Sequence, residues 1–246
     1  MLRIEDLDFE RCKPEFLSAI LEDLRWFGFS WDEGPDHGGE FGPYEQSGRR
    51  QHYATGFEKL QRGGFVYPCF CSRQDVLRVL QAPHMGDEEP VYPGTCRERS
   101  ITETASDLGR TASWRFQVPD GEIVSFQDGN YGPQRFIAGK DFGDFLVWRH
   151  DNQAAYQLAA TIDDSEMKIT EVVRGADLLL STARQLLLYR ALGLLPPRFF
   201  HCPLITDATG TRLAKRHDAL SLRALRARGE TPESIRQTWA TDPSAP

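Results

Sequence analysis

The apolar and polar positions of the first eight residues indicate a strand that leads into a group of carboxylates. Leu2 and Ile4 are flanked by the charged residues Arg3, Glu5, Asp6 and Asp8. Chain ends usually tolerate disorder, so this density of charge predicts a strand end that supplies a site. The alternative is a frayed terminus whose charges pair locally.

Two amphipathic helices are predicted next. In the first, Pro14 suits an initial turn, and apolar residues recur at helical spacing until Gly28. The second runs from about Tyr53 to the glycine pair at 63–64, after a Gly-rich acidic loop at residues 32–42. Strand followed by helix indicates an α/β opening.

The chain changes character from Cys69. A short helix that Ser72 and Asp75 cap leads into a Pro/Gly-punctuated loop, which ends near Cys96. Alternation in residues 113–118 and 122–128 around Pro-Asp-Gly predicts a β-hairpin, and residues 144–149 resemble a further strand. We interpret this region as a module inserted into the α/β domain.

The α/β character returns at residue 154. A small-residue apolar stretch to residue 162 precedes a predicted buried strand at 169–173, and a helix begins at Thr182. Thr182 and Gln185 form a capping-box pattern, and Gly193 ends that helix. We therefore predict four parts: residues 1–68, an insertion at 69–150, a second α/β part at 151–200, and a C-terminal helical region at 201–246.

Composition narrows the class of protein. A chain of 246 residues with 40% apolar content can bury a full core. It has no apolar run of membrane-spanning length and no secretory leader, which predicts a cytoplasmic protein. Five cysteines, an odd number, argue against a disulfide framework and leave metal binding or burial. The net charge of −7 does not indicate a nucleic-acid binder as a whole.

Three thiols and a phenol fall within the predicted insertion. They are Cys69, Cys71, Tyr92 and Cys96. A closed tetrahedral zinc site can hold together a module too small for its own core. From the residues alone the fourth ligand is open among Tyr92, His84 and water, and buried reduced cysteines are the alternative.

Two polar features could contact an anionic substrate. Arg174 follows a predicted strand, and a guanidinium at a strand's carboxyl end suits a carboxylate or phosphate, although pairing with Glu171 or Asp177 is equally compatible. Tyr156 either faces the same crevice or packs in the core. The glycine-led loop around Lys215 suits polyphosphate, and the basic residues between 212 and 228 indicate a polyanion contact or a solvated helix face.

Together these motifs resemble the class I glutamyl-tRNA synthetase family, from residue 2 to about residue 225. The motifs are RIEDLD, YPCFCSR followed by YPGTC, AAYQLA, TEVVRGADLL with STARQ, and GTRLAKRHDAL. The similarity is greatest to the short members that glutamylate the queuosine base of tRNA(Asp). It implies a Rossmann-like catalytic domain interrupted by a zinc-containing insertion.

The resemblance also implies roles for individual residues. Glu5 would pair with the ammonium group of L-glutamate, and Tyr156 and Arg174 would make the other contacts to this amino acid. Lys215, in a KMSKS-type loop that has Ala214 where a hydroxyl is usual, would be the catalytic residue that steadies the ATP phosphates. The four insertion residues match the family's ligands for one structural Zn²⁺, with Tyr92 as the fourth.

The implied reaction is formation of glutamyl adenylate from ATP with Mg²⁺, followed by transfer to tRNA(Asp) bearing queuosine, and we expect a monomer. The early end of the chain predicts no anticodon-binding domain. The first strand and the HIGH-type segment of the family are not found, which predicts a start upstream of Met1 and impaired activity in these 246 residues. The alternatives are a truncated glutamyl-tRNA synthetase and a non-catalytic, zinc-stabilised tRNA-binding remnant.

Overall fold

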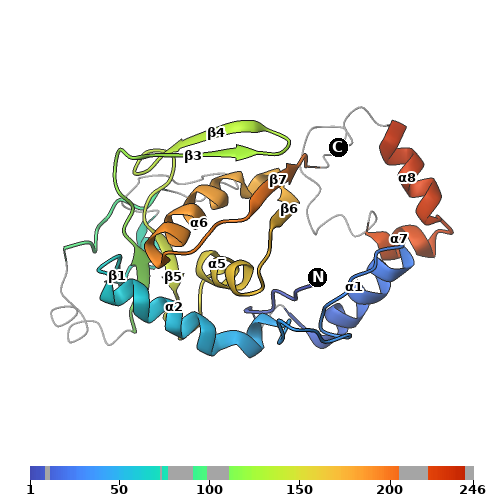
Figure 1. The fold of residues 1–246 in the computed structure, drawn as a ribbon, viewed down its shortest axis with the longest axis horizontal. Helices are drawn as coiled ribbons and strands as arrows, with labels where there is room; N and C mark the ends of the chain where they lie inside the picture. The colour runs from blue at the N-terminus through green and yellow to red at the C-terminus, as the bar shows by residue number, and fades with distance from the viewer. Residues whose placement is uncertain (9–11, 73, 77–90, 99–110, 205–220, 242–246) are drawn as a thin grey trace. The chain divides into compact units, whose positions relative to one another are not determined.

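The computed structural model describes residues 1–8, 12–72, 74–76, 91–98, 111–204 and 221–241 (Figure 1). It divides the chain into two compact units. The first unit comprises residues 1–48, 173–177 and 201–246, and the second comprises residues 49–172 and 178–200.

The first unit contains three helices of the described chain: α1 (Pro14–Trp26), α7 (Leu222–Ala227) and α8 (Pro232–Thr241). Pro14 occupies the first turn of α1, and Gly28 turns the chain away at a φ of 97°. Arg226 donates to Glu22 at 2.8 Å and lies over the ring of Trp26. Ion pairs and a cation–π contact thus join α7 to α1.

The amino terminus is extended but forms little regular strand. Ile4 makes an isolated parallel bridge with Glu45, in which its amide donates to the carbonyl of Tyr44 at 2.8 Å. Asp6 then accepts bonds from the amide and hydroxyl of Ser47, at 2.8 and 2.6 Å. The predicted strand at residues 2–4 is therefore a single bridge, followed by a carboxylate that is tied to the start of η1 (Gln46–Arg49).

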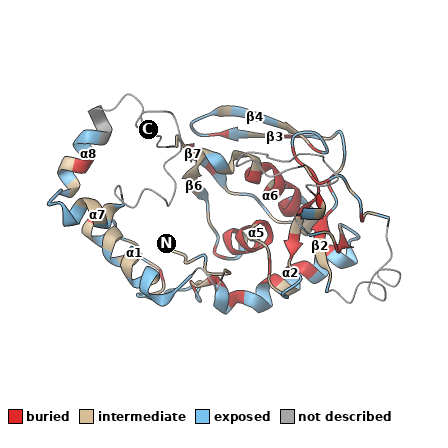
Figure 2. Ribbon diagram, turned by 180° about the vertical axis from the view of Figure 1, so that it is seen from behind, coloured by how far each residue is buried: buried red, intermediate tan, exposed pale blue. Residues whose placement is uncertain are grey.

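The second unit combines helices with parts of two sheets. Its helices are α2 (Arg50–Arg62), α5 (Tyr156–Glu166) and α6 (Leu179–Leu192), the last preceded by η2 (Ala176–Leu178). One sheet has the order β1-β2-β5, with β1 (Val66–Cys69), β2 (Ser113–Phe116) and β5 (Phe145–Trp148) all antiparallel. Figure 2 shows that α5 and α6 are largely buried.

The second sheet is mixed and has the order β4-β3-β7-β6. Its strands are β3 (Ile123–Asp128), β4 (Gly132–Ile137), β6 (Glu171–Gly175) and β7 (Arg198–Cys202). Strand β3 pairs antiparallel with β4 and in parallel with β7. Aromatic rings also join α2 to the first sheet, where Phe57 of α2 stacks on Trp148 of β5 with ring centroids 4.8 Å apart.

The predicted hairpin of residues 113–118 and 122–128 is wrong. The turn is real, because Glu122 donates to the carbonyl of Pro119 at 3.0 Å and Gly121 has a φ of 82°. It connects the two sheets, however, and β3 forms its hairpin with β4 instead. Asp128 shapes that second turn by accepting the amides of Asn130 and Tyr131, at 3.0 and 2.9 Å.

Two further expectations need correction. The strand at 169–173 was expected to be buried, but β6 alternates between exposed and partly buried positions, and Val173 is 62% exposed. Helix α6 begins at Leu179, so Thr182 lies inside it and donates to the carbonyl of Leu178 rather than capping the helix. The predicted end is confirmed: Gly193 is left-handed, with a φ of 68°.

The reciprocal bonds predicted for Ser72 and Asp75 are present. The amide of Ser72 donates to the Asp75 carboxylate at 2.8 Å, and the amide of Asp75 donates to the Ser72 hydroxyl at 3.2 Å. Within the described ranges, no helix has both the length and the apolar character needed to cross a membrane.

Candidate metal centre and substrate site

Four donor atoms converge beside the β1-β2-β5 sheet. Cys69 ends β1, Cys71 lies two residues later, and Tyr92 and Cys96 come from the loop at residues 91–98. We refer to these four residues as the Cys/Tyr cluster. The three sulfur atoms lie within 4.8 Å of one another, and the Tyr92 hydroxyl lies 3.5 Å from both Cys69 Sγ and Cys71 Sγ. Cys71 Sγ lies 3.5 Å from Cys96 Sγ.

The backbone around the cluster explains why the loop approaches the sheet so closely. A Cβ atom at Gly143 would lie 2.8–2.9 Å from the backbone nitrogen and oxygen of Tyr92, so only glycine leaves room for the loop. Gly94 has a φ of 77°, and its carbonyl accepts the amide of Arg97 at 2.9 Å in a tight turn. This turn brings Cys96 back toward the phenol, whose oxygen accepts the Cys96 amide at 3.1 Å.

The far side of this loop is held by ion pairs. Arg97 donates twice to Asp144, at 2.6 Å each, and twice to Asp120, at 2.5 and 3.1 Å. Asp144 also accepts the Tyr67 hydroxyl at 2.5 Å and the amide of Val118 at 2.9 Å. Burial, followed by the hydrogen bond from its hydroxyl to Asp144, raises the pKa of Tyr67. These contacts tie the loop at residues 91–98 to the start of β5 and to the turn before β3.

Burial dominates the electrostatics of the cluster without a metal. It raises the pKa of Cys71 to about 12, and burial followed by the hydrogen bond to Cys69 raises the pKa of Tyr92. Burial opposes ionisation of Cys96 as well, but hydrogen bonds from Tyr92 and from the Phe70 amide lower its pKa overall. In the metal-free cluster, Cys96 therefore loses its proton more readily than Cys71 or Tyr92.

The donor set fits a zinc ion. Three sulfurs and one oxygen, nearly all buried, are close enough to surround one small ion. Thiols that keep their protons in the metal-free state would lose them to a divalent cation. The structure therefore brings together the four residues predicted as ligands, whereas His84 lies outside the described residues.

The three residues predicted to contact glutamate fall in different parts of the chain. Glu5, with its side chain 43% exposed, accepts a bond from Arg3 at 3.0 Å in the first unit. Arg174 lies in the same unit near the end of β6, and Tyr156 begins α5 in the second unit. Lys215 lies outside the described residues.

Arg174 has a partner that the sequence did not indicate. Its Nε lies 3.1 Å from Nε2 of His201, which is fully buried on β7. A guanidinium can only donate, so Nε2 must accept and the ring proton must sit on Nδ1. The bond to His201 uses Nε of Arg174 and restricts the plane of the guanidinium.

The predicted basic segment is only partly described. Within the described helix α7, Arg223 pairs with Asp23 at 3.5 Å and Arg226 pairs with Glu22 at 2.8 Å. Both arginines therefore neutralise acids of α1. These contacts favour the helix-face alternative for this part of the segment, and residues 212–220 lie outside the described residues.

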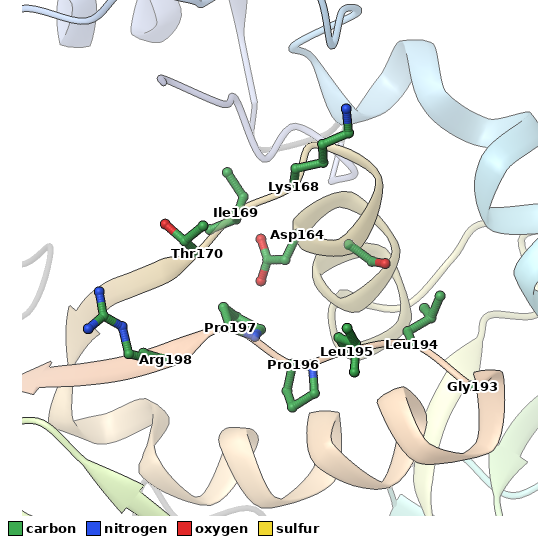
Figure 3. Close-up of a pocket in the computed structure, with 11 residues that line it drawn as sticks. Asp164, Lys168, Ile169, Thr170, Gly193, Leu194, Leu195, Pro196, Pro197 and Arg198 are labelled. Atoms are coloured by element: carbon green, nitrogen blue, oxygen red, sulfur yellow. The ribbon is translucent and has the colours of Figure 1, made fainter.

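One cavity of the second unit is lined by none of the predicted site residues. It has a volume of about 520 Å³ and is bounded by the end of α5, the residues before β6, and the loop from α6 to β7. Figure 3 shows the Asp164 side chain directed into this space, with Arg198 at one end. No sequence signal marked it, because its walls come from three separate segments.

Comparison with known proteins gives consistent matches. The family model described as tRNA synthetases class I (E and Q), catalytic domain, matches residues 1–240. A glutamyl-Q tRNA(Asp) synthetase from Nitratidesulfovibrio vulgaris is 50% identical over 96% of this chain and 73% of its own length. Glutamate–tRNA ligase 2 from Nitrosococcus oceani is 44% identical over 96% of this chain, which spans 50% of that ligase. The crystal structure of glutamate–tRNA synthetase from Elizabethkingia anophelis has a TM-score of 0.75 and 30% identity, covering 87% of this chain and 45% of its own.

Proposed function

Because the chain belongs to the catalytic-domain family of class I tRNA synthetases for glutamate and glutamine, we propose that it activates glutamate with ATP and transfers it to the queuosine base of tRNA(Asp). Members of this family are ligases. One observation supports the queuosine base as the acceptor: the sequence identity is 50% with a glutamyl-Q tRNA(Asp) synthetase and 44% with a glutamate–tRNA ligase. A glutamyl-tRNA synthetase activity is the alternative.

The proposed first step joins glutamate to the α-phosphate of ATP. A carboxylate oxygen attacks the α-phosphorus, the bond to the bridging oxygen breaks, and pyrophosphate leaves with Mg²⁺. No protein nucleophile is needed, so the protein contributes positioning and charge compensation. Lys215 is the residue that we propose for the phosphates. In the second step the glutamyl group passes to the base and AMP leaves.

We propose that Glu5, Tyr156 and Arg174 bind glutamate. Glu5 would pair with the ammonium group, and the Arg174 guanidinium would donate to a carboxylate in the bidentate geometry that suits it. The bond from Arg174 Nε to the buried His201 supports this role, since it restricts the guanidinium to one plane. A pre-oriented fork loses less entropy when the substrate binds.

We further propose that Cys69, Cys71, Tyr92 and Cys96 hold one structural zinc ion. When bound, the ion would cross-link β1 to the loop at residues 91–98, in a region whose apolar core is small. We also propose that the protein is a monomer with the domain boundaries predicted from the sequence. The zinc content of purified protein, measured by atomic emission, tests the metal site directly.

The decisive experiment separates the two chemical steps. Glutamate-dependent exchange of pyrophosphate into ATP, without tRNA, tests activation. Glutamyl adenylate supplied directly tests transfer without needing ATP. When the glutamyl group of this adenylate is labelled, we expect the label to appear on tRNA(Asp) that carries queuosine and not on tRNA(Asp) without it. Label on tRNA(Glu) would favour the alternative, and label on no tRNA would refute the proposed acceptor.

A further inference from the structure

Arg115 contacts two members of the Cys/Tyr cluster at once. It lies in β2 and is only 9% exposed. Its Nε donates to Cys69 Sγ at 3.3 Å, and its Cζ lies 3.9 Å from the centroid of the Tyr92 ring. One buried cation therefore touches both a thiol sulfur and the face of the only oxygen donor.

The guanidinium is held in this position by the sheet. Its Nη1 donates to the backbone carbonyl of Asp144 at 2.8 Å. The Asp144 carboxylate is fixed in turn by Arg97, Tyr67 and the amide of Val118. Stacking on Tyr92 uses the flat face of the guanidinium, while both hydrogen bonds use its edge. Lysine has no flat face and cannot make these contacts together.

The positive charge of Arg115 compensates negative charge on the proposed ligands. Three thiolates and one phenolate carry four negative charges, and a divalent ion compensates two of them. Two negative charges would remain at a site where Cys69, Tyr92 and Cys96 are each at most 5% exposed. Uncompensated charge is costly in such surroundings, and a cation in contact with the ligands offsets part of it.

We infer that Arg115 is a positioning residue of the metal centre: it compensates the charge of the ligand set and keeps Cys69 and the Tyr92 phenolate oriented for metal binding. This inference rests on the proposed zinc site. Residues that orient metal ligands in this way typically change metal affinity 10- to 100-fold when they are removed. It also explains how a tyrosine can serve where a fourth cysteine would be usual.

The test compares metal affinity in matched variants. Arg115→Met keeps the aliphatic stem and removes the charge, and Arg115→Lys keeps the charge without the flat fork. Arg49→Met is the control, since Arg49 is also buried in the same unit and has ion pairs to Asp163 and Glu166. Zinc affinity is measured by competition with a colorimetric chelator, and the ligand field is read from the absorption of the cobalt-substituted protein.

We expect zinc affinity to fall at least 10-fold in Arg115→Met, to fall less in Arg115→Lys, and to change little in Arg49→Met. The cobalt spectrum should shift in both Arg115 variants. In a Tyr92→Phe background, Arg115→Met should cost less, because the phenolate charge that Arg115 compensates is absent. If Arg115→Met does not fold, Arg115→Lys, made in the wild-type and in the Tyr92→Phe background, still decides.

The outcomes distinguish the inference from the function on which it rests. A wild-type chain that binds no zinc overturns both the metal site and the role of Arg115. A wild-type chain that binds one zinc, with Arg115→Met and Arg115→Lys binding as tightly and giving the same cobalt spectrum, overturns only the role of Arg115. Equal losses in Arg115→Met and Arg49→Met would assign the effect to general destabilisation and also overturn it.

Discussion

The substitution Asp163→Asn should destabilise the second unit more than any change at its surface. Asp163 is fully buried in α5 and accepts two strong bonds. Its Oδ1 lies 2.6 Å from Arg49 Nε, and its Oδ2 lies 2.9 Å from the Tyr53 hydroxyl. Arg49 is itself only 2% exposed. These bonds join the start of α2 to α5, the helix that begins at Tyr156.

The expected magnitude follows from the burial of both charges. Replacing the carboxylate by an amide removes the negative charge but leaves the Arg49 guanidinium in place. Its other ion pair, to Glu166 at 2.8 Å, involves a carboxylate that is 43% exposed and therefore contributes less. Breaking a buried pair in this way costs about 3–5 kcal/mol of unfolding free energy. For a chain of this length that lowers the melting temperature by about 6–20 °C.

Equilibrium unfolding in urea, with zinc present throughout, measures the effect. Tyr53→Phe serves as an intermediate case and should cost about 1.5–3 kcal/mol, the value of a bond to a charged acceptor. Glu166→Gln is the surface control and should cost less than about 1 kcal/mol. If Asp163→Asn proves no more costly than Glu166→Gln, burial is not what gives this ion pair its strength.

Three further predictions concern the two candidate sites. Gly143→Ala should weaken zinc binding in chelator competition, because its Cβ would meet the Tyr92 backbone at 2.8–2.9 Å and displace the phenol. His201→Leu should raise the dissociation constant of glutamate about 2- to 10-fold by calorimetry, because Arg174 loses the acceptor that orients it. In metal-free protein at about pH 8, Cys71 should be alkylated far more slowly than the exposed Cys12, since burial raises the pKa of Cys71 to about 12. Equal alkylation rates for the two cysteines, measured by mass spectrometry, would contradict this.

Helix positions were predictable where the signals are local. Helices α1 and α2 carry regular apolar spacing, and each is followed by a glycine that turns the chain, Gly28 at a φ of 97° and Gly64 at a φ of 70°. Gly193 ends α6 for the same reason. The start of α6 was missed by three residues because Thr182 has the composition of a cap, while the buried interior accepted it as a helical residue.

Strand pairing was not predictable because it depends on distant partners. The turn at residues 119–122 forms as its residues indicate, yet β2 on one side pairs with β1 and β5, and β3 on the other pairs with β4 and β7. A turn sequence specifies how the backbone bends, but the sheet that each strand joins is set by packing across the whole unit. Strand β4 begins with Gly132 and Pro133, which are poor strand signals.

The candidate sites show the same difference between local signals and distant partners, which explains which site residues could be predicted from the sequence. Donor side chains such as the cysteines have a specific chemistry and a recognisable spacing, so they are visible along the chain. The residues that contact those side chains are ordinary by composition and distant in sequence: Arg115 is 46 residues from Cys69, and His201 is 27 from Arg174. Each is buried, and each is identified only by the charge that it faces. A site predicted from sequence is therefore a list of reactive groups, and the fold adds the buried partners that fix their orientation and charge.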